Sequence, residues 1–198
     1  MGRVVRHNGG LLVSSGKPVR DGRGDVGSTW AVLSGAAAPY GRWELPLSLA
    51  VGETRSSDYD VVAELVPTSG ADRPCADTVT IARWSGLGTG MTIGAAHGPQ
   101  AWSRTLDTEG VGHDIPIVGV EVAPDHVTWF LDGRPIGSVR SRKVAPGGPL
   151  TLRLGLEGDQ SEHDSSELAS DWQRSYALAP GRQVTRAPAL RTSARTGC

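Results

Sequence analysis

The chain has few aromatic residues, almost no lysine and only two cysteines. One phenylalanine and three tyrosines accompany six tryptophans among 198 residues. The 20 basic and 21 acidic residues leave a formal net charge of −1, which gives no field strong enough to attract nucleic acid or an anionic membrane. No apolar run approaches the roughly 20 residues that a membrane-spanning helix needs. We therefore expect neither a nucleic acid nor a membrane as a partner.

The two cysteines offer little chemistry. Cys75 lies in the central part of the chain and Cys198 is the last residue, so a disulfide would require the C-terminal stretch to fold back onto the domain. We interpret both as free thiols. Neither has the spacing of a metal ligand, and we expect no metal and no cofactor. The acidic stretch EGDQSEHDSSE, residues 157–167, also lacks the ligand spacing of a calcium loop and is interpreted as a solvated turn.

Turns and short strands dominate the pattern. The 27 glycines and 13 prolines gather in segments such as PTSGADRP and APGGP, and no run of 10 to 12 residues has a helical period. Between them, apolar residues alternate with polar ones, which is typical of strands with one buried face. Trp43, Leu45, Leu47, Leu49 and Val51 share one face of the clearest such segment. In a second segment the same face holds Leu150, Leu152, Leu154 and Leu156.

About ten strands follow from this pattern. Besides the two segments above, they are expected at residues 10–13, 30–34, 59–66, 78–84, 91–95, 116–122, 126–131 and 171–178. Short strands separated by turns every 8 to 15 residues predict an all-β fold, an antiparallel two-sheet sandwich or jelly roll. We expect one domain over residues 1–178. Residues 179–198 have lost the alternation and are predicted to be a disordered basic tail.

Several segments, in order, resemble glycoside hydrolase family 16, the jelly-roll β-glucanases with a concanavalin A-like fold. PYGRWELPLSL is similar to that family's YGR(F/W)E strand, and VEVAPDHVTWFLDGRPI to its hairpin VEWTPDRITWYVDG. SDWQRSYAL is similar to its closing strand DWVRVY. The resemblance covers roughly residues 8–178. It implies the sandwich fold and β-glucan as the substrate class, whereas activity has to be argued from the site.

The catalytic motif that the resemblance implies is not complete in this chain. The family carries three acids on one strand as Glu-x-Asp-x-x-Glu, and retaining hydrolysis needs two carboxyl groups about 5 to 5.5 Å apart. The corresponding stretch here is RPCADTVTIARW. Asp77 then falls on the nucleophile position, Val79 on the middle position, and Ala82 on the acid/base position, or Ile81 if the strand has no bulge. Valine and alanine cannot transfer a proton.

A second acid could come from elsewhere in the chain. SSDYDVVAELVP holds Asp58, Asp60 and Glu64, so Glu64 or Asp58 are the alternative acid/base residues. This segment is also similar to the strand that precedes the catalytic one in the family. For sugar contacts we single out Trp84, His97, Gln100 and Trp102, because aromatic faces and polar side chains near the cleft recognise pyranose rings. A core position is the competing interpretation for each tryptophan.

Three functions are consistent with the sequence. The first is a non-catalytic family-16-like protein, a pseudoenzyme that binds a β-glucan-type polysaccharide or oligosaccharide in a residual cleft. The second is an active endo-β-glucan hydrolase using Asp77 with Glu64 or Asp58. The third is a structural or partner-binding sandwich. We expect a monomer. The sequence as it stands shows no secretion signal and is consistent with the cytoplasm, although the family that it resembles is mostly secreted.

Overall fold

A computed structural model describes most of the chain. It describes residues 2–7, 9–15, 27–33, 37–51, 59–69, 76–85, 90–108, 115–141, 143–158, 166–178 and 187–195. All regular structure in these ranges is β-strand, and none of the described residues forms a helix that could span a membrane. Asp58, Cys75, Cys198 and most of the acidic stretch at 157–167 lie outside these ranges.

The larger of two facing sheets has seven antiparallel strands. Its order is β16 (Arg191–Ala194), β9 (Gln100–Asp107), β8 (Gly90–His97), β7 (Thr78–Ser85), β6 (Asp60–Pro67), β13 (Leu150–Glu157) and β3 (Thr29–Val32). β7, on which the sequence placed the catalytic motif, therefore lies in the middle of this sheet, between β6 and β8. The adjacency of β6 and β7 matches the family resemblance of the two segments.

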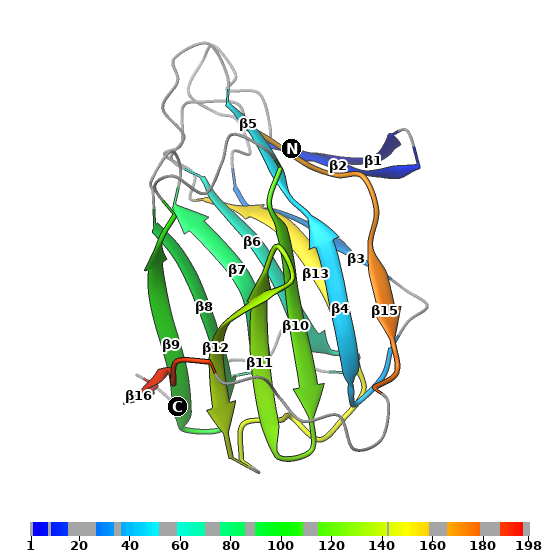
Figure 1. Ribbon diagram of the computed structural model, residues 1–198. Coiled ribbons are helices and arrows are strands. Elements are labelled where there is room, and N and C mark those ends of the chain that lie inside the picture. Colours follow the sequence, from blue (N-terminus) through cyan, green and yellow to red (C-terminus); the bar gives the residue numbers. More distant parts are fainter. Residues whose placement is uncertain are drawn as a thin grey trace.

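A five-stranded sheet covers the larger one, and a four-stranded sheet lies at one end (Figure 1). The five strands are, in order, β12 (Arg134–Arg140), β11 (His126–Leu131), β10 (Ile117–Ala123), β4 (Gly41–Pro46) and β15 (Arg174–Tyr176). The four are β1 (Arg3–His7), β2 (Gly10–Ser14), β14 (Ser166–Ser170) and β5 (Ser48–Val51). The predicted all-β, antiparallel jelly roll is confirmed.

The core lies between the seven-stranded and five-stranded sheets. Leu150, Leu152, Leu154 and Leu156 are all buried in it, as their alternation predicted. Trp43, Leu45 and Leu47 are buried in the same core, but the segment that contains them is two strands rather than one. It leaves the five-stranded sheet after Pro46 and continues as β5 in the four-stranded sheet. Leu47, at the break, donates its backbone N–H to the carbonyl of Pro116.

One side-chain hydrogen bond joins the two facing sheets at the middle of β7. Trp129 of β11 is completely buried, and its indole N–H donates to the backbone carbonyl of Thr80 over 2.8 Å. The register of β6 against β7 pairs Ala63 with Ala82 and Glu64 with Thr80, so Ile81 is an extra residue and forms a β-bulge. A bulge disrupts the ladder locally. The Trp129 indole supplies a hydrogen-bond donor for the carbonyl of Thr80, the residue before the bulge.

The C-terminal stretch is partly folded, which corrects the prediction of a disordered tail for residues 187–195. Ser138 of β12 donates its backbone N–H to Pro188, and Leu190 donates back to Ser138. The chain then forms β16, which pairs with the edge strand β9. Leu190 is buried in the core between the two connections. Residues 187–195 thus connect β12 of the five-stranded sheet with β9 of the seven-stranded sheet, as Figure 1 shows.

Removing only the Trp129 N–H should destabilise the fold. Trp129→Phe leaves the Thr80 carbonyl buried without this donor, at a cost of about 1–3 kcal/mol beyond the lost ring volume. Trp43→Phe is the matched control, because Trp43 is buried in the same five-stranded sheet and its indole donates no hydrogen bond in the part of the chain that the structure describes. Urea unfolding measures both variants. Equal losses of unfolding free energy would contradict the role given to this bond.

Candidate functional site

The two faces of β7 have different chemistry. Val79, Ile81 and Ala82 are buried in the core between the sheets. Thr80 and Arg83 point to the other side, because Thr80 pairs with Glu64 and Arg83 with Val62, on the opposite face from Leu65 and Ala63. We call this side of the seven-stranded sheet, which points away from the five-stranded sheet, the open face.

The structure places Val79 and Ala82, to which the resemblance assigned the middle and acid/base positions, on the core side of β7. The predicted bulge is present. Thr78, Thr80 and Arg83 are the residues of β7 that lie on the open face and have the same spacing as the three acids of Glu-x-Asp-x-x-Glu. Because side chains of a strand alternate, a slip of one residue moves the whole set to the opposite face. None of these three side chains is a carboxylic acid.

Asp77 stabilises a hairpin. Its Oδ1 accepts the backbone N–H of Gly98 over 3.0 Å, and its Oδ2 lies 2.8 Å from Nδ1 of His97. His97 is the last residue of β8, and Gly98 begins the turn to β9. The guanidinium of Arg195 adds bonds to the carbonyls of Gly98 and Ala76, which ties the C-terminal segment to the same turn. Asp77 therefore has a structural role that accounts for its carboxylate.

Asp77 and Glu64 lie on opposite faces of the sheet. Thr78 pairs with Ala96, which puts Asp77 opposite His97 and on the side of Val79. Glu64 pairs with Thr80 on the open face. Two carboxyl groups separated by a sheet cannot flank one glycosidic bond, so this pair does not form the predicted catalytic site.

The four predicted sugar contacts do not lie on the open face either. Trp102 pairs with Ala95 and is buried in the core with 7% of its surface exposed. Trp84 pairs with Val61 and Met91, both core residues, and packs against the core. Gln100 is exposed, but it lies opposite His97 at the hairpin turn. The competing core interpretation was correct for Trp102.

Arg83 occupies the centre of an ion-pair cluster on the open face. Its guanidinium lies 2.6 Å from Oδ2 of Asp60 on β6 and 2.7 Å from Oε2 of Glu157 on β13. Asp60 and Glu157 are direct partners across the two strands. Their negative charges therefore lie side by side, and the positive charge of Arg83 compensates them.

A second cluster links β6, β13 and the edge strand β3. Nε and Nη2 of Arg153 lie 2.7 and 2.6 Å from Oε1 of Glu64. The guanidinium also stacks on the ring of Trp30, 4.6 Å from its centroid. Glu64 is almost completely buried, and this burial raises its pKa from the ordinary value of 4.5, with the charge of Arg153 offsetting part of the rise.

The three carboxyl groups of these clusters are all engaged by arginines. Retaining hydrolysis needs one free carboxylate as nucleophile and one protonated carboxyl group beside it. Asp60, Glu64 and Glu157 are instead each ion-paired with an arginine. Asp60 and Glu64 stand out in the sequence as acidic residues, whereas Arg83, Arg153, Glu157 and Trp30 were not predicted as site residues. Period-two alternation from the apolar face of each strand would have indicated Arg153, Glu157 and Trp30, whereas Arg83 reaches the open face only because of the bulge at Ile81.

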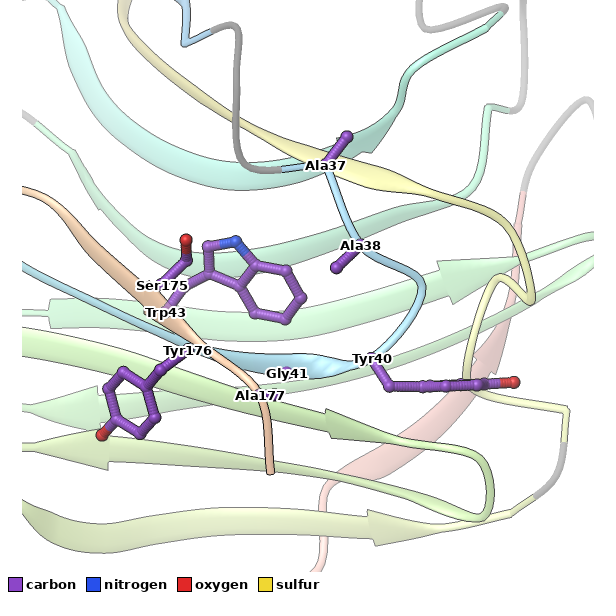
Figure 2. Close-up of a pocket in the computed structure, with 8 residues that line it drawn as sticks. All are labelled: Ala37, Ala38, Tyr40, Gly41, Trp43, Ser175, Tyr176 and Ala177. Atoms are coloured by element: carbon purple, nitrogen blue, oxygen red, sulfur yellow. The ribbon is translucent and has the colours of Figure 1, made fainter. Parts of the chain in front are cut away.

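A cavity of about 230 Å³ lies elsewhere, beside β4 and β15 (Figure 2). Trp43, Ala38 and Ser175 belong to its lining, together with Tyr40 and Tyr176, and its eight lining residues include no carboxyl, imidazole or thiol group. In Figure 2 the Trp43 ring points toward Ala38, whereas Tyr176 points to the other side of its strand. The phenols of Tyr40 and Tyr176 are therefore the only ionisable side-chain groups among these eight lining residues. Among the described residues, no group of three His, Cys, Asp or Glu side chains could hold a metal.

Comparisons with known proteins place the fold. No protein-family model matches the sequence, and no curated protein matches it. The structure matches the catalytic domain of a laminarinase, an endo-1,3-β-glucanase, from Thermotoga petrophila with a TM-score of 0.68, 18% identity, and coverage of 87% of this chain and 79% of that one. The laminarinase from Rhodothermus marinus matches with a TM-score of 0.69, 15% identity and coverage of 88% and 80%.

A third match holds a ligand. It is a mutant of SCLam, a non-specific endo-β-1,3(4)-glucanase from family GH16, which presents a 1,3-β-D-cellobiosyl-glucose at its active site. Its TM-score is 0.66 at 13% identity, with coverage of 88% of this chain and 77% of that one. At such identities the likeness shows that the chain has the jelly-roll fold of the family-16 glucanases.

Removing Arg83 should expose the repulsion between its two partners. In Arg83→Ala, Asp60 and Glu157 remain opposite each other as like charges, and we expect a loss of about 0.2–1 kcal/mol of unfolding free energy at low salt. Added salt should narrow this loss. Arg134→Ala, at an exposed position without an ion pair among the described residues, is the control. An Arg83→Ala variant as stable as the parent at low salt would contradict the cluster.

Glu64 should make the free energy of unfolding depend on pH, and the direction of its pKa shift fixes the sign of this dependence. Because the folded protein raises its pKa, the folded state favours the protonated acid, and this stabilisation is lost as the pH rises from 4.5 through the raised pKa. Glu64→Gln has no such titration. The unfolding free energy of the parent minus that of the variant should therefore fall as the pH rises from 4.5 through the raised pKa. A difference that grows over this range would mean that Arg153, and not burial, controls the pKa.

Proposed function

We propose that this protein binds a β-glucan-type polysaccharide on the open face of the seven-stranded sheet without hydrolysing it. The observation that carries the proposal is the set of side chains that β7 presents there, Thr78, Thr80 and Arg83. Hydroxyl and guanidinium groups bind sugar hydroxyls, but a threonine or an arginine cannot serve as the acid of a glycosidase at neutral pH.

The rest of the open face supports the same function. Thr92 of β8 and Thr105 of β9 face each other with their hydroxyls 3.0 Å apart, which adds polar groups beside β7. The two arginines and three carboxyl groups of the two clusters supply further hydrogen-bond donors and acceptors. A surface of this kind suits a neutral ligand rich in hydroxyl groups. The fold is one that the SCLam variant uses to hold a glucan oligosaccharide.

The hydrolase alternative has less support. It requires Asp77 to attack while Glu64 or Asp58 donates a proton. Asp77 is engaged by Gly98 and His97 on the other side of the sheet, and Asp58 lies outside the described residues. The third possibility, a structural or partner-binding sandwich, predicts that no glucan binds at all, so the same experiment distinguishes it.

Binding and turnover should be measured on the same preparation. In native affinity electrophoresis, laminarin and a mixed-linkage β-1,3-1,4-glucan in the gel should slow the protein, whereas dextran should not. A reducing-end assay on the same polysaccharides should give no more product than buffer, with an active laminarinase as the positive control. Release of reducing ends that co-purifies with the folded protein would overturn the absence of catalysis. Unchanged mobility in every β-glucan would overturn binding and favour the structural alternative.

A further inference from the structure

At the β3 edge, the open face presents an aromatic and an apolar side chain next to its charged groups. Trp30 and Val32 are two residues apart on β3 and lie on the open face, opposite Gly155 and Arg153 of β13. Val32 is 58% exposed, the largest exposure among the large hydrophobic residues that the structure describes as exposed. An edge strand thus presents an indole and an exposed apolar side chain next to a cluster of charged groups.

Gly155 allows the Trp30 ring to lie close against the sheet. A Cβ on Gly155 would overlap the Cε3 and Cδ2 atoms of the ring, so no other residue fits this position without moving the indole. Arg153, two residues earlier on the same strand, stacks on the ring with its guanidinium. The ring is therefore fixed before any ligand arrives, which lowers the entropic cost of using it for binding.

Arg153 is itself held in place. Both of its bonds to Glu64 go to one oxygen, Oε1, through Nε and Nη2. Nη1 is not used in this pair, so its N–H groups can donate to the hydroxyls of a ligand. Glu64 is too deeply buried to be the main contact, and its role is to position the guanidinium. The arrangement combines a flat apolar surface with a rigid planar donor beside it.

We propose that Trp30 and Arg153 form a subsite for one neutral pyranose unit, with Glu64 as a positioning residue. Trp30 is half-buried, so part of its indole remains exposed beside the stacked guanidinium. The C–H face of the sugar packs on this part, and the sugar hydroxyls accept from Nη1 of Arg153. This inference rests on the proposed function and places the main sugar contact at the β3–β13 edge rather than at β7. A uronate or sulfate ester is disfavoured, because Glu64, Glu157 and Asp60 outnumber the two arginines among the clustered charges.

The chain contains a matched control for this subsite. Trp172 also has an arginine stacked on its ring, with the Arg174 guanidinium 4.0 Å from the centroid, but it lies between β14 and β15, outside the seven-stranded sheet. Trp30→Ala should weaken binding of laminarin about tenfold in affinity electrophoresis or calorimetry. Trp172→Ala should leave it unchanged. Alginate, a polyuronate, should not bind the parent protein.

A second variant guards against loss of folding. Arg153→Lys keeps the charge but not the planar fork, and should weaken laminarin binding several-fold while the unfolding curve stays cooperative. Glu64→Gln, which keeps a hydrogen-bond acceptor for Arg153, should retain more affinity than Glu64→Ala. Folded Trp30→Ala and Arg153→Lys variants that bind laminarin like the parent would overturn the subsite and leave the proposed function standing. If the parent itself does not bind, the proposed function fails.

Discussion

The hydrogen bond from the Trp129 indole to the Thr80 carbonyl fixes the strand on which the functional argument depends. It crosses from one sheet to the other at the bulge of β7, where Ile81 is the extra residue. A bulge changes which side chains point to which face, and a buried carbonyl without a partner is costly. By accepting from Trp129, Thr80 is held with its side chain toward the open face and with Val79 and Ile81 in the core.

This orientation determines the chemistry of the open face. Once Thr80 and Arg83 point outward, Arg83 lies between Asp60 and Glu157, and the carboxylates of the neighbouring strands are neutralised by arginines. The fold is shared with family-16 glucanases, but the electrostatics of this surface are those of a compensated ion-pair network. Each of the carboxyl groups of Asp60, Glu64 and Glu157 lies within ion-pair distance of an arginine.

Period-two alternation was sufficient to predict the fold. The leucines at 150–156 and the Trp43 segment are in the core because burying one face of a strand dominates its energetics. Strands without a clean apolar face were missed, namely β1, β9, β12, β14 and β16. The four residues of β16 are all exposed, so only its pairing with the edge of β9 makes it a strand. The strand expected at 171–178 is reduced to the three residues of β15.

The candidate site was harder to predict than the fold, because it depends on register. Aligning acids led to Asp77, but alternation from the apolar Val79 and Ile81 would have indicated Thr78 and Thr80, whereas Arg83 reaches the open face only because of the bulge at Ile81. Asp77 was misleading because a carboxylate that caps a turn looks the same in sequence as one that attacks a sugar. The pairing of Asp60 with Glu157 could not be seen at all, since it depends on how strands far apart in the chain align.

Thiol labelling would test the orientation of β7 most directly. In a background with Cys75→Ser and Cys198→Ser, cysteine is placed either at Thr80 or at Val79, and the folded proteins are treated with a maleimide. We predict that Thr80→Cys reacts in the folded state and that Val79→Cys reacts only after unfolding. The reverse pattern would contradict the account, because it would return the motif positions of the sequence resemblance to the open face.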